Sequence, residues 1–192
     1  MGRWEEGARE RLVLAAVDLF TERGYDDTTV AQIAERAGVT RSTFFRYFPD
    51  KREVLAAGQE TLTRLLTEGI AEAPPGATPM EAVGAGLTRM STALGPINRE
   101  LGPRVRAVIA ASAELQQRDA AKSLGLAAAI SATLVRRGIP EPTAAVAGGL
   151  GVLAFGRGFT RWLEGDVATS EEFARLALEA LDELRTASAA LA

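Results

Sequence analysis

The sequence predicts an all-α protein in which a small N-terminal three-helix domain is followed by a larger helical domain. Three observations predict this fold class. Apolar residues recur at helical spacing along almost the whole chain, glycine and proline divide these segments, and no segment after residue 24 alternates as a strand does. The 192 residues are 47% hydrophobic and 24% charged, which is typical of globular proteins. We place the domain boundary after residue 52, so that the two domains span residues 1–52 and 53–192.

The segment 28–51 predicts two short helices joined by a tight turn. Thr29, with Gln32 three positions later, is a capping box that begins the first helix. Gly38 suits the left-handed conformation that ends a helix. Thr40 suits the cap of the second helix, which the proline at position 49 ends. Two helices joined by a short turn that contains glycine form a helix-turn-helix.

The second helix of this pair carries hydroxyl, aromatic and basic side chains that suit DNA. In a helix-turn-helix, the N-terminal residues of the second helix meet base edges in the major groove. Arg41, Ser42 and Thr43 occupy that end. Lys51 follows at the start of the next helix, capped by Asp50, where a cation beside free amide groups suits a phosphate. The competing interpretation is an ordinary helical hairpin whose aromatic residues all belong to the core. The predicted DNA-binding residues are Thr29, Thr40, Arg41, Ser42, Thr43, Phe45, Arg46, Tyr47 and Lys51.

This stretch resembles the TetR-type transcriptional repressors over about the first quarter of the chain. Two residues depart from the family pattern: Ser42 stands where many members carry Gly, and Phe45 stands where many carry a Tyr that contacts phosphate. Phenylalanine cannot donate a hydrogen bond, so that contact is not expected here. The resemblance is carried by Thr29, Ile33, Ala34, Ala37, Gly38, Val39, Thr40, Thr43, Phe44, Phe45, Tyr47, Phe48, Lys51 and Leu55.

The resemblance implies a homodimeric regulator, a repressor rather than an activator, that leaves its double-stranded DNA operator when an effector binds. The implied effector is a small, mostly apolar molecule bound among the helices of residues 78–164, where its binding moves the helix over 51–71. The candidate effector-binding residues, each of which also suits a plain core, are Met90, Ile109, Phe155, Phe159 and Trp162. The alternative function is a helical small-molecule-binding or protein-interaction module that binds no operator. The sequence does not specify the operator, the effector or the regulated genes.

The distribution of charge agrees with a DNA-binding N-terminal domain. The net charge is −3, from 22 Lys and Arg against 25 Asp and Glu. Residues 1–52 hold nine of each sign, so the excess of acid, 13 cations against 16 anions, lies in residues 53–192. DNA binding requires a basic patch rather than a basic protein. The segment 36–52 is locally basic, because it contains four arginines and one lysine against one aspartate.

The residue types that are missing argue against catalysis and against a metal site. The chain has no Cys and no His, which removes the usual metal ligands, the usual general base and the thiol nucleophile. The segment 149–154 matches a dinucleotide fingerprint superficially, but it lies inside a predicted helix, and that motif must follow a strand. We therefore expect no enzyme activity, no cofactor and no metal. No apolar run reaches membrane-spanning length and no signal peptide is evident, so we expect a soluble, cytoplasmic protein.

The last two predicted helices suggest self-association. Gly149 and Gly156 are seven residues apart, and glycine within a helix costs about 1 kcal/mol relative to alanine, so close approach of another helix is a reason for them. Ser170 suits the cap of the last helix. We expect two copies to pair through a four-helix interface; the alternative is that both apolar stripes are intramolecular core. The predicted interface residues are Gly149, Val152, Gly156, Leu163, Phe173, Leu176, Ala180 and Leu184. The predicted helices span 5–23, 30–37, 41–48, 51–71, 78–94, 104–117, 120–137, 143–164 and a final helix that begins at 170.

Overall fold

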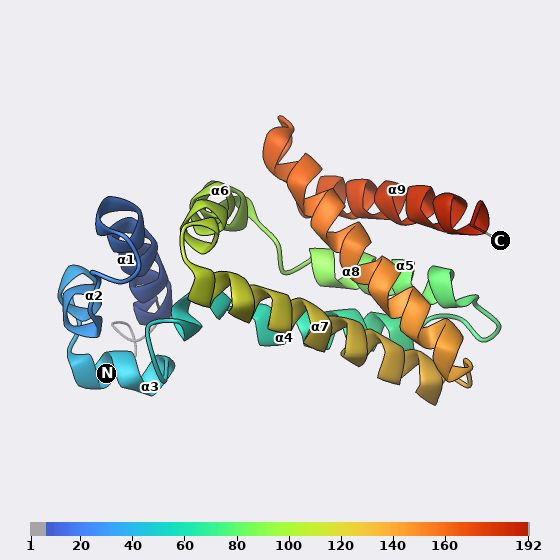
Figure 1. Cartoon of the computed structure of the whole chain (residues 1–192), viewed down its shortest axis with the longest axis horizontal. Coiled ribbons are helices and arrows are strands. Elements are labelled where there is room, and N and C mark those ends of the chain that lie inside the picture. The colour runs from blue at the N-terminus through green and yellow to red at the C-terminus, as the bar shows by residue number, and fades with distance from the viewer. Residues whose placement is uncertain (1–6, 192) are drawn as a thin grey trace. The chain divides into compact units, whose positions relative to one another are not determined.

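The computed structural model describes residues 7–191 and confirms the all-α fold class. Within this range the chain forms helices joined by turns and loops, without a strand. No helix in the same range is long and apolar enough to cross a membrane. The helices, shown in Figure 1, are α1 (Ala8–Arg23), α2 (Val30–Arg36), α3 (Arg41–Tyr47), the short 3₁₀ helix η1 (Glu53–Ala56), α4 (Gln59–Ala71), α5 (Pro79–Ser91), α6 (Pro96–Ala110), α7 (Ala113–Arg136), α8 (Glu141–Glu164) and α9 (Ser170–Ala189).

The chain divides into two compact units. The N-terminal unit contains the residues up to Gly58 together with Leu101–Asp119, and the larger unit contains Gln59–Glu100 with the residues from Ala120 onward. The N-terminal unit therefore extends beyond residue 52 and includes a segment from the middle of the chain. Helices α6 and α7 each contribute residues to both units. The first two residues of the predicted helix 5–23 lie outside the described range.

The N-terminal unit is built from three short helices around an apolar core. Leu12, Ala16 and Phe20 on α1 are almost fully buried, and so are Ile33 on α2 and Phe44 on α3. Val108 on α6 and Leu115 on α7 belong to the same hydrophobic cluster. The core of this unit is thus completed by side chains that lie more than fifty residues away in the sequence.

The predicted continuous helix over 51–71 is wrong. After α3 the chain forms η1, reaches Gly58, and only then enters α4. Gly58 has a φ of +90°, a conformation that L-residues with side chains rarely adopt, so the helix cannot pass through this position. The periodic apolar residues of this segment are real, but glycine divides them between two helices.

Two further helix boundaries differ from the sequence-based prediction. The predicted helices leave a gap between residues 94 and 104, but α6 begins at Pro96 and contains Pro103 in its interior. The break comes at residues 111–112 instead. Proline is well tolerated in the first helical turn, which explains Pro96. The last helix is capped by Thr169, whose hydroxyl accepts a hydrogen bond from the Glu172 amide at 3.2 Å, so Ser170 is its first residue rather than its cap.

Glycines let the helix backbones of the larger unit approach closely. A Cβ added at Gly158 on α8 would lie 2.6 Å from the Cα of Ala177 on α9, and one at Gly148 would lie 2.6 Å from the carbonyl oxygen of Ala127 on α7. Gly69 on α4 stands in the same relation to Gly86 on α5, at 2.8 Å. Close approach of the backbones therefore explains why glycine stands inside these helices, although it destabilises a helix relative to alanine.

Aromatic side chains fill the space between α8 and α9. Phe155, Phe159 and Trp162 from α8 surround Phe173 from α9, with ring centroids 5.7–6.3 Å from that of Phe173. Trp162 is fully buried, and its indole N–H donates a hydrogen bond to the Thr169 carbonyl at 3.0 Å. The buried indole therefore has a polar partner, as buried tryptophan usually does.

Replacing Gly158 with alanine is expected to destabilise the larger unit by about 2–3 kcal/mol, because the new methyl group meets backbone atoms of α9 that cannot rotate away. The matched control is Gly125→Ala on α7, where an added Cβ meets nothing within 4 Å. That change should stabilise the protein by up to about 1 kcal/mol through helix propensity. Urea unfolding followed by circular dichroism measures both. Equal unfolding free energies for the two variants would contradict the close contact.

Candidate nucleic-acid interface

Helix α3 buries one face and exposes the other. Phe44 is fully buried and Phe48, which ends the helix, is nearly so, with their ring centroids 5.8 Å apart. Arg41, Ser42 and Arg46 are exposed, and Phe45 has half of its surface exposed. An exposed phenylalanine on the same helix as two exposed arginines suits contact with a sugar or a thymine methyl group.

The hydroxyl groups of Thr29 and Thr40 cap the N-termini of α2 and α3. The Thr29 side chain accepts a hydrogen bond from the Gln32 amide, and the Gln32 side chain accepts one from the Thr29 amide at 2.8 Å, so the predicted capping box is present. The Thr40 hydroxyl accepts a hydrogen bond from the Thr43 amide at 3.1 Å and lies 3.0 Å from the Thr43 hydroxyl. Thr29 and Thr40 are exposed, so both remain accessible at the helix N-termini.

The basic residues of the segment 36–52 do not all face outward as free charges. Arg36 forms a two-pronged ion pair with Glu22 of α1 at 2.8–2.9 Å, and this hydrogen-bonded guanidinium lowers the pKa of Glu22. Arg46 lies with its guanidinium 5.2 Å from the centre of the Tyr47 ring. Arg41 and Arg46 are both exposed, so α3 presents arginine side chains at the surface.

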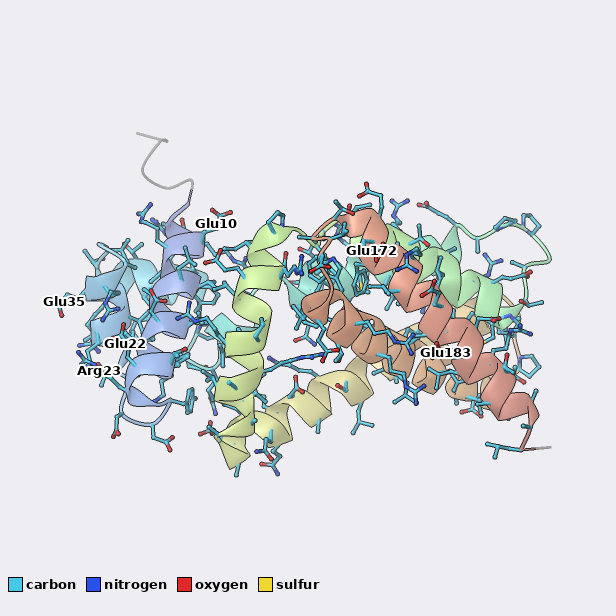
Figure 2. All side chains as sticks on the ribbon, turned by 90° about the horizontal axis from the view of Figure 1, so that it is seen from above. Glu10, Glu22, Arg23, Glu35, Glu172 and Glu183 are labelled. Atoms are coloured by element: carbon cyan, nitrogen blue, oxygen red, sulfur yellow. The ribbon has the colours of Figure 1, made fainter. Side chains whose placement is uncertain are left out.

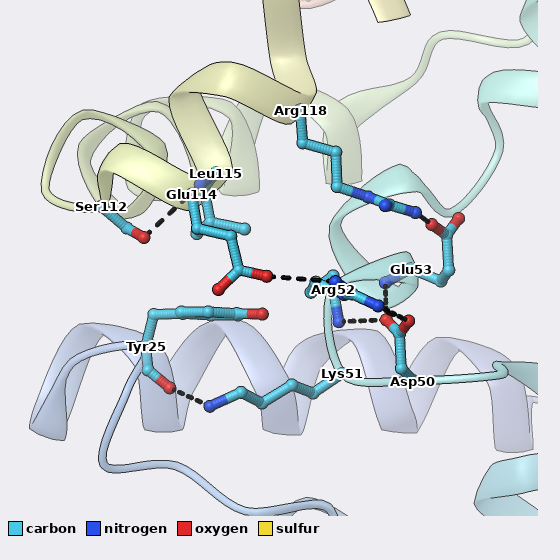
Figure 3. Close-up of polar contacts among 9 residues, drawn as sticks. All are labelled: Tyr25, Asp50, Lys51, Arg52, Glu53, Ser112, Glu114, Leu115 and Arg118. Atoms are coloured by element: carbon cyan, nitrogen blue, oxygen red, sulfur yellow. Dashed lines mark hydrogen bonds and ion pairs between the residues drawn. The ribbon is translucent and has the colours of Figure 1, made fainter. Parts of the chain in front are cut away.

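Lys51 is hydrogen-bonded to the loop between α1 and α2. Its ammonium group donates hydrogen bonds to the carbonyl oxygens of Tyr25 at 2.6 Å, Thr28 at 2.9 Å and Asp26 at 3.2 Å. Figure 3 shows the side chain extended toward the Tyr25 carbonyl. An ammonium group has three N–H donors, and all three are used. The phosphate contact expected of Lys51 therefore stays a prediction, and the structure shows a second use of its ammonium group.

A chain of charged residues connects the turn after α3 with the start of α7 (Figure 3). The Asp50 carboxylate accepts hydrogen bonds from the Arg52 guanidinium, at 2.6 Å, and from the Arg52 amide, at 2.8 Å; the guanidinium is the main reason why the pKa of Asp50 is lowered. Arg52 also pairs with Glu114 at 3.2 Å, and Glu53 pairs with Arg118. Glu114 and Arg118 are one helical turn apart, so the two ion pairs join the adjacent residues Arg52 and Glu53 to one face of α7.

The partners in this network lie far from one another in the sequence. Glu114 lies 62 residues from Arg52, and Arg104 on α6, which pairs with Asp18 on α1 at 2.6 Å, lies 86 residues from its partner. No local spacing connects such residues, so a single sequence offers no signal for them.

The predicted interface residues of the last helix belong to the protein's own core. Phe173 and Ala180 are fully buried and Leu184 is nearly so, which agrees with the intramolecular alternative rather than with an exposed interface. Val152, Leu163 and Leu176 are partly buried and pack against the same hydrophobic cluster. Gly149 and Gly156 differ, because an added Cβ at either position meets nothing within 4 Å.

The candidate effector-binding residues do not form one group. Met90 and Trp162 are buried in the core of the larger unit, and Phe155 and Phe159 pack against that core. Ile109 packs instead against the cluster of the N-terminal unit. Within residues 7–191, no three His, Cys, Asp or Glu side chains gather as a possible metal site.

The geometry of α2 and α3, a capped pair with a glycine turn and an outward basic face, is that of a helix-turn-helix DNA-binding domain. The family described as "Bacterial regulatory proteins, tetR family" matches residues 12–57, which include most of α1 and all of α2, α3 and η1. Residues 12–57 are thus a helix-turn-helix domain of the TetR family, and the resemblance seen in the sequence is confirmed.

Individual relatives align over the same part of the chain. The HTH-type transcriptional regulator TcmR of Streptomyces glaucescens is 36% identical over 75 residues, which are 39% of this chain and 33% of TcmR. The HTH-type transcriptional regulator SrpR of Pseudomonas putida is 44% identical over 52 residues, which are 27% of this chain and 24% of SrpR. The alignments thus span a third or less of the length of these relatives.

Solved structures resemble the whole chain. The SmeT–triclosan complex has a TM-score of 0.59 at 21% identity, over 91% of this chain and 90% of SmeT. NalD, the secondary repressor of the MexAB-OprM multidrug efflux pump in Pseudomonas aeruginosa, has a TM-score of 0.53 at 21% identity, over 93% of this chain and 96% of NalD. At such low identity these similarities establish the fold: an N-terminal helix-turn-helix domain followed by a larger helical domain.

Tyr25 provides a prediction for alkaline pH. Burial, reinforced by the charge of Glu114, raises the pKa of its phenol from 10.0 to about 12. Between pH 10 and 12 the unfolded chain loses this proton while the folded chain keeps it, so the Tyr25 contribution to stability is complete below pH 10 and is lost as the pH rises through 12. Absorbance titration at the phenolate band should show an ionisation near pH 12 that Tyr25→Phe lacks. An unchanged titration in Tyr25→Phe would contradict this assignment.

Proposed function

We propose that this protein is a homodimeric, ligand-responsive, DNA-binding transcriptional regulator of the cytoplasm, acting as a repressor that a small, mostly apolar effector releases from its operator. Residues 1–52 serve as the reading domain, and residues 53–192 bind the effector and the second copy. The observation that carries the proposal is the outward face of α3, where Arg41, Ser42, Phe45 and Arg46 are exposed on a helix capped at its N-terminus.

The proposed mode of reading follows from the orientation of α3. The N-terminal end of the helix enters the major groove, where Arg41 can donate two hydrogen bonds to a guanine and Ser42 can contact either base or phosphate. Phe45 supplies apolar contact in place of a hydrogen bond. Two copies place two such helices in successive major grooves, with half-sites separated by one or more steps of about 34–36 Å.

Arg41→Ala is expected to weaken binding to the preferred duplex by about 1–3 kcal/mol and to relax the preference at the base it contacts, because a bidentate base contact is lost. The preferred duplex is first selected from a random pool with the wild-type protein, and fluorescence anisotropy then measures the affinity. The control is Arg185→Ala on α9, which removes the same charge from a residue whose guanidinium pairs with Asp182. Wild-type affinity and preference in Arg41→Ala would overturn the assignment of α3.

An exposed apolar stripe on α8 supports self-association. Val146 and Leu153 are 61% and 54% exposed, and Gly149 and Gly156 lie on the same face with open space above them. The outer face of α9 is different, because Arg175 pairs there with Glu172 and Glu179 (Figure 2 labels Glu172). We therefore place the two-fold contact on α8, where the glycines allow two backbones to approach and the apolar side chains leave water.

Leu153→Glu is expected to weaken dimerisation by about 100-fold or more, because the two-fold axis brings two carboxylates into one apolar contact. Sedimentation velocity over a range of protein concentrations measures the dissociation constant. Val167→Glu, in the loop before α9, introduces the same charge at a valine of similar exposure and should leave the dimer intact. A Leu153→Glu variant that stays folded and dimeric would remove α8 from the interface.

The alternative function, a helical binding module without an operator, predicts a different outcome of the selection experiment. Such a protein would enrich no duplex from the random pool at physiological salt, while still binding small apolar molecules in the larger unit. The SmeT–triclosan complex shows that a protein of this fold binds an aromatic small molecule, which supports testing such ligands here. Met90, Phe155, Phe159 and Trp162 remain the candidates to line that site.

A further inference from the structure

The environment of Lys51 is unusual for a surface lysine. Three backbone carbonyl oxygens, those of Tyr25, Asp26 and Thr28, converge on its ammonium group at 2.6–3.2 Å. The same nitrogen lies 4.2 Å from the centre of the Tyr25 ring, within the range of a cation–π interaction. Lysine suits this site because its ammonium is a compact charge with three donors in a tripod, which match the three carbonyls.

The three carbonyls belong to the loop that leads from α1 into α2, and that loop is itself ordered. Gly24 has a φ of +87° and turns the chain out of α1. The buried Thr28 hydroxyl donates to the Gly24 carbonyl at 2.8 Å. The next residue, Thr29, is the N-cap of α2. The position of Thr28 therefore decides where α2 begins.

Lys51 joins this loop to the far end of α3. It lies four residues beyond the last residue of α3, after the bend at Pro49 and Asp50. The two helices of the helix-turn-helix are linked directly by the turn at Gly38, which connects the end of α2 to the start of α3. Lys51 provides a second link between the opposite ends of the same two helices. The turn and the lysine therefore connect α2 and α3 at both ends, which fixes the angle between the two helices.

We propose that Lys51 is a positioning residue for DNA reading, which orients α3 through the α1–α2 loop, and that it does not contact phosphate. This inference rests on the proposed DNA-binding function. A phosphate contact would require the ammonium to leave three carbonyls and the Tyr25 ring, whereas a positioning role uses the side chain as it stands. The role is transmitted through backbone carbonyls, so it depends on the shape of the cation as well as on its charge.

The two roles predict opposite behaviour of Lys51→Arg. Arginine keeps the positive charge and would still serve a phosphate, but its planar guanidinium does not fit a tripod of carbonyls. If Lys51 positions α3, the variant should bind the selected duplex about ten-fold more weakly while binding to an unrelated duplex stays within about two-fold of wild type. If Lys51 contacts phosphate, the variant should bind both duplexes like the wild type, and that result would overturn the proposal.

Lys51→Met gives a second, independent comparison. Methionine keeps an apolar stem beside Tyr25 and loses the charge. A lost phosphate contact would lower the slope of log K against log salt by about 0.9 on every duplex, whereas a lost positioning contact should leave the slope on the unrelated duplex unchanged. Lys122→Met on α7 is the charge-matched control. All titrations are made well below the melting temperature of each variant, so that a loss of folded protein cannot imitate a loss of preference.

Amide hydrogen exchange without DNA separates this proposal from the proposed function. In Lys51→Met the amides of residues 28–32 should exchange at least about ten-fold faster than in the wild type, while those in the middle of α1 keep their protection. Unchanged exchange at residues 28–32 would show that Lys51 does not stabilise this loop, and it would overturn the proposal even if the protein binds DNA. Wild-type protein that selects no duplex, combined with faster exchange in the variant, would instead refute the DNA-binding function and leave the link intact.

Discussion

The orientation of α3 depends on the burial of one side chain, Phe44. The helix has seven residues, and helices of this length are not stable alone in water, because nucleation is costly and few hydrogen bonds repay it. Phe44 is fully buried against Phe48 and the α1 core, so burial both stabilises the helix and sets its rotation. The exposed arginines, Ser42 and Phe45 face outward because Phe44 faces inward. The Thr40 cap and the Lys51 link then fix the two ends.

The sequence predicted best those features, such as helix caps, that depend on residues close to one another in the chain. The capping box at Thr29 and the Thr40 cap are present, because each depends on a side chain and a backbone amide three residues apart. The left-handed Gly38 is also present, because glycine adopts this conformation without steric cost. The sequence predicted poorly where the outcome depends on the wider fold. Gly58 and Gly102 are both glycines, yet the first lies at a break between two helices and the second lies inside one.

The candidate sites show the same division. An amphipathic stripe indicates that a helix buries a face, but it does not say whether the partner is the same chain or another copy, and Phe173 and Ala180 proved to be intramolecular. A lysine at the right place in a motif indicates a cation, but its partners are set by the loop it reaches, 23–26 residues earlier in the chain. The pairs of Arg52 with Glu114 and of Asp18 with Arg104 are also long-range. They depend on how helices pack, and a single sequence contains no local record of that packing.

The composition of the N-terminal unit bears on the order in which the protein acquires structure. Val108 and Leu115 complete its hydrophobic cluster, yet a ribosome releases them long after α1, α2 and α3 have emerged. Until then the nascent helices present an open apolar side around Phe20 and Tyr25, and the chain between must close a loop of some fifty residues before that side is covered. A truncated product that stops at Gly58 would keep this side permanently bare. Such fragments should aggregate and be degraded readily, although they contain every residue of the helix-turn-helix.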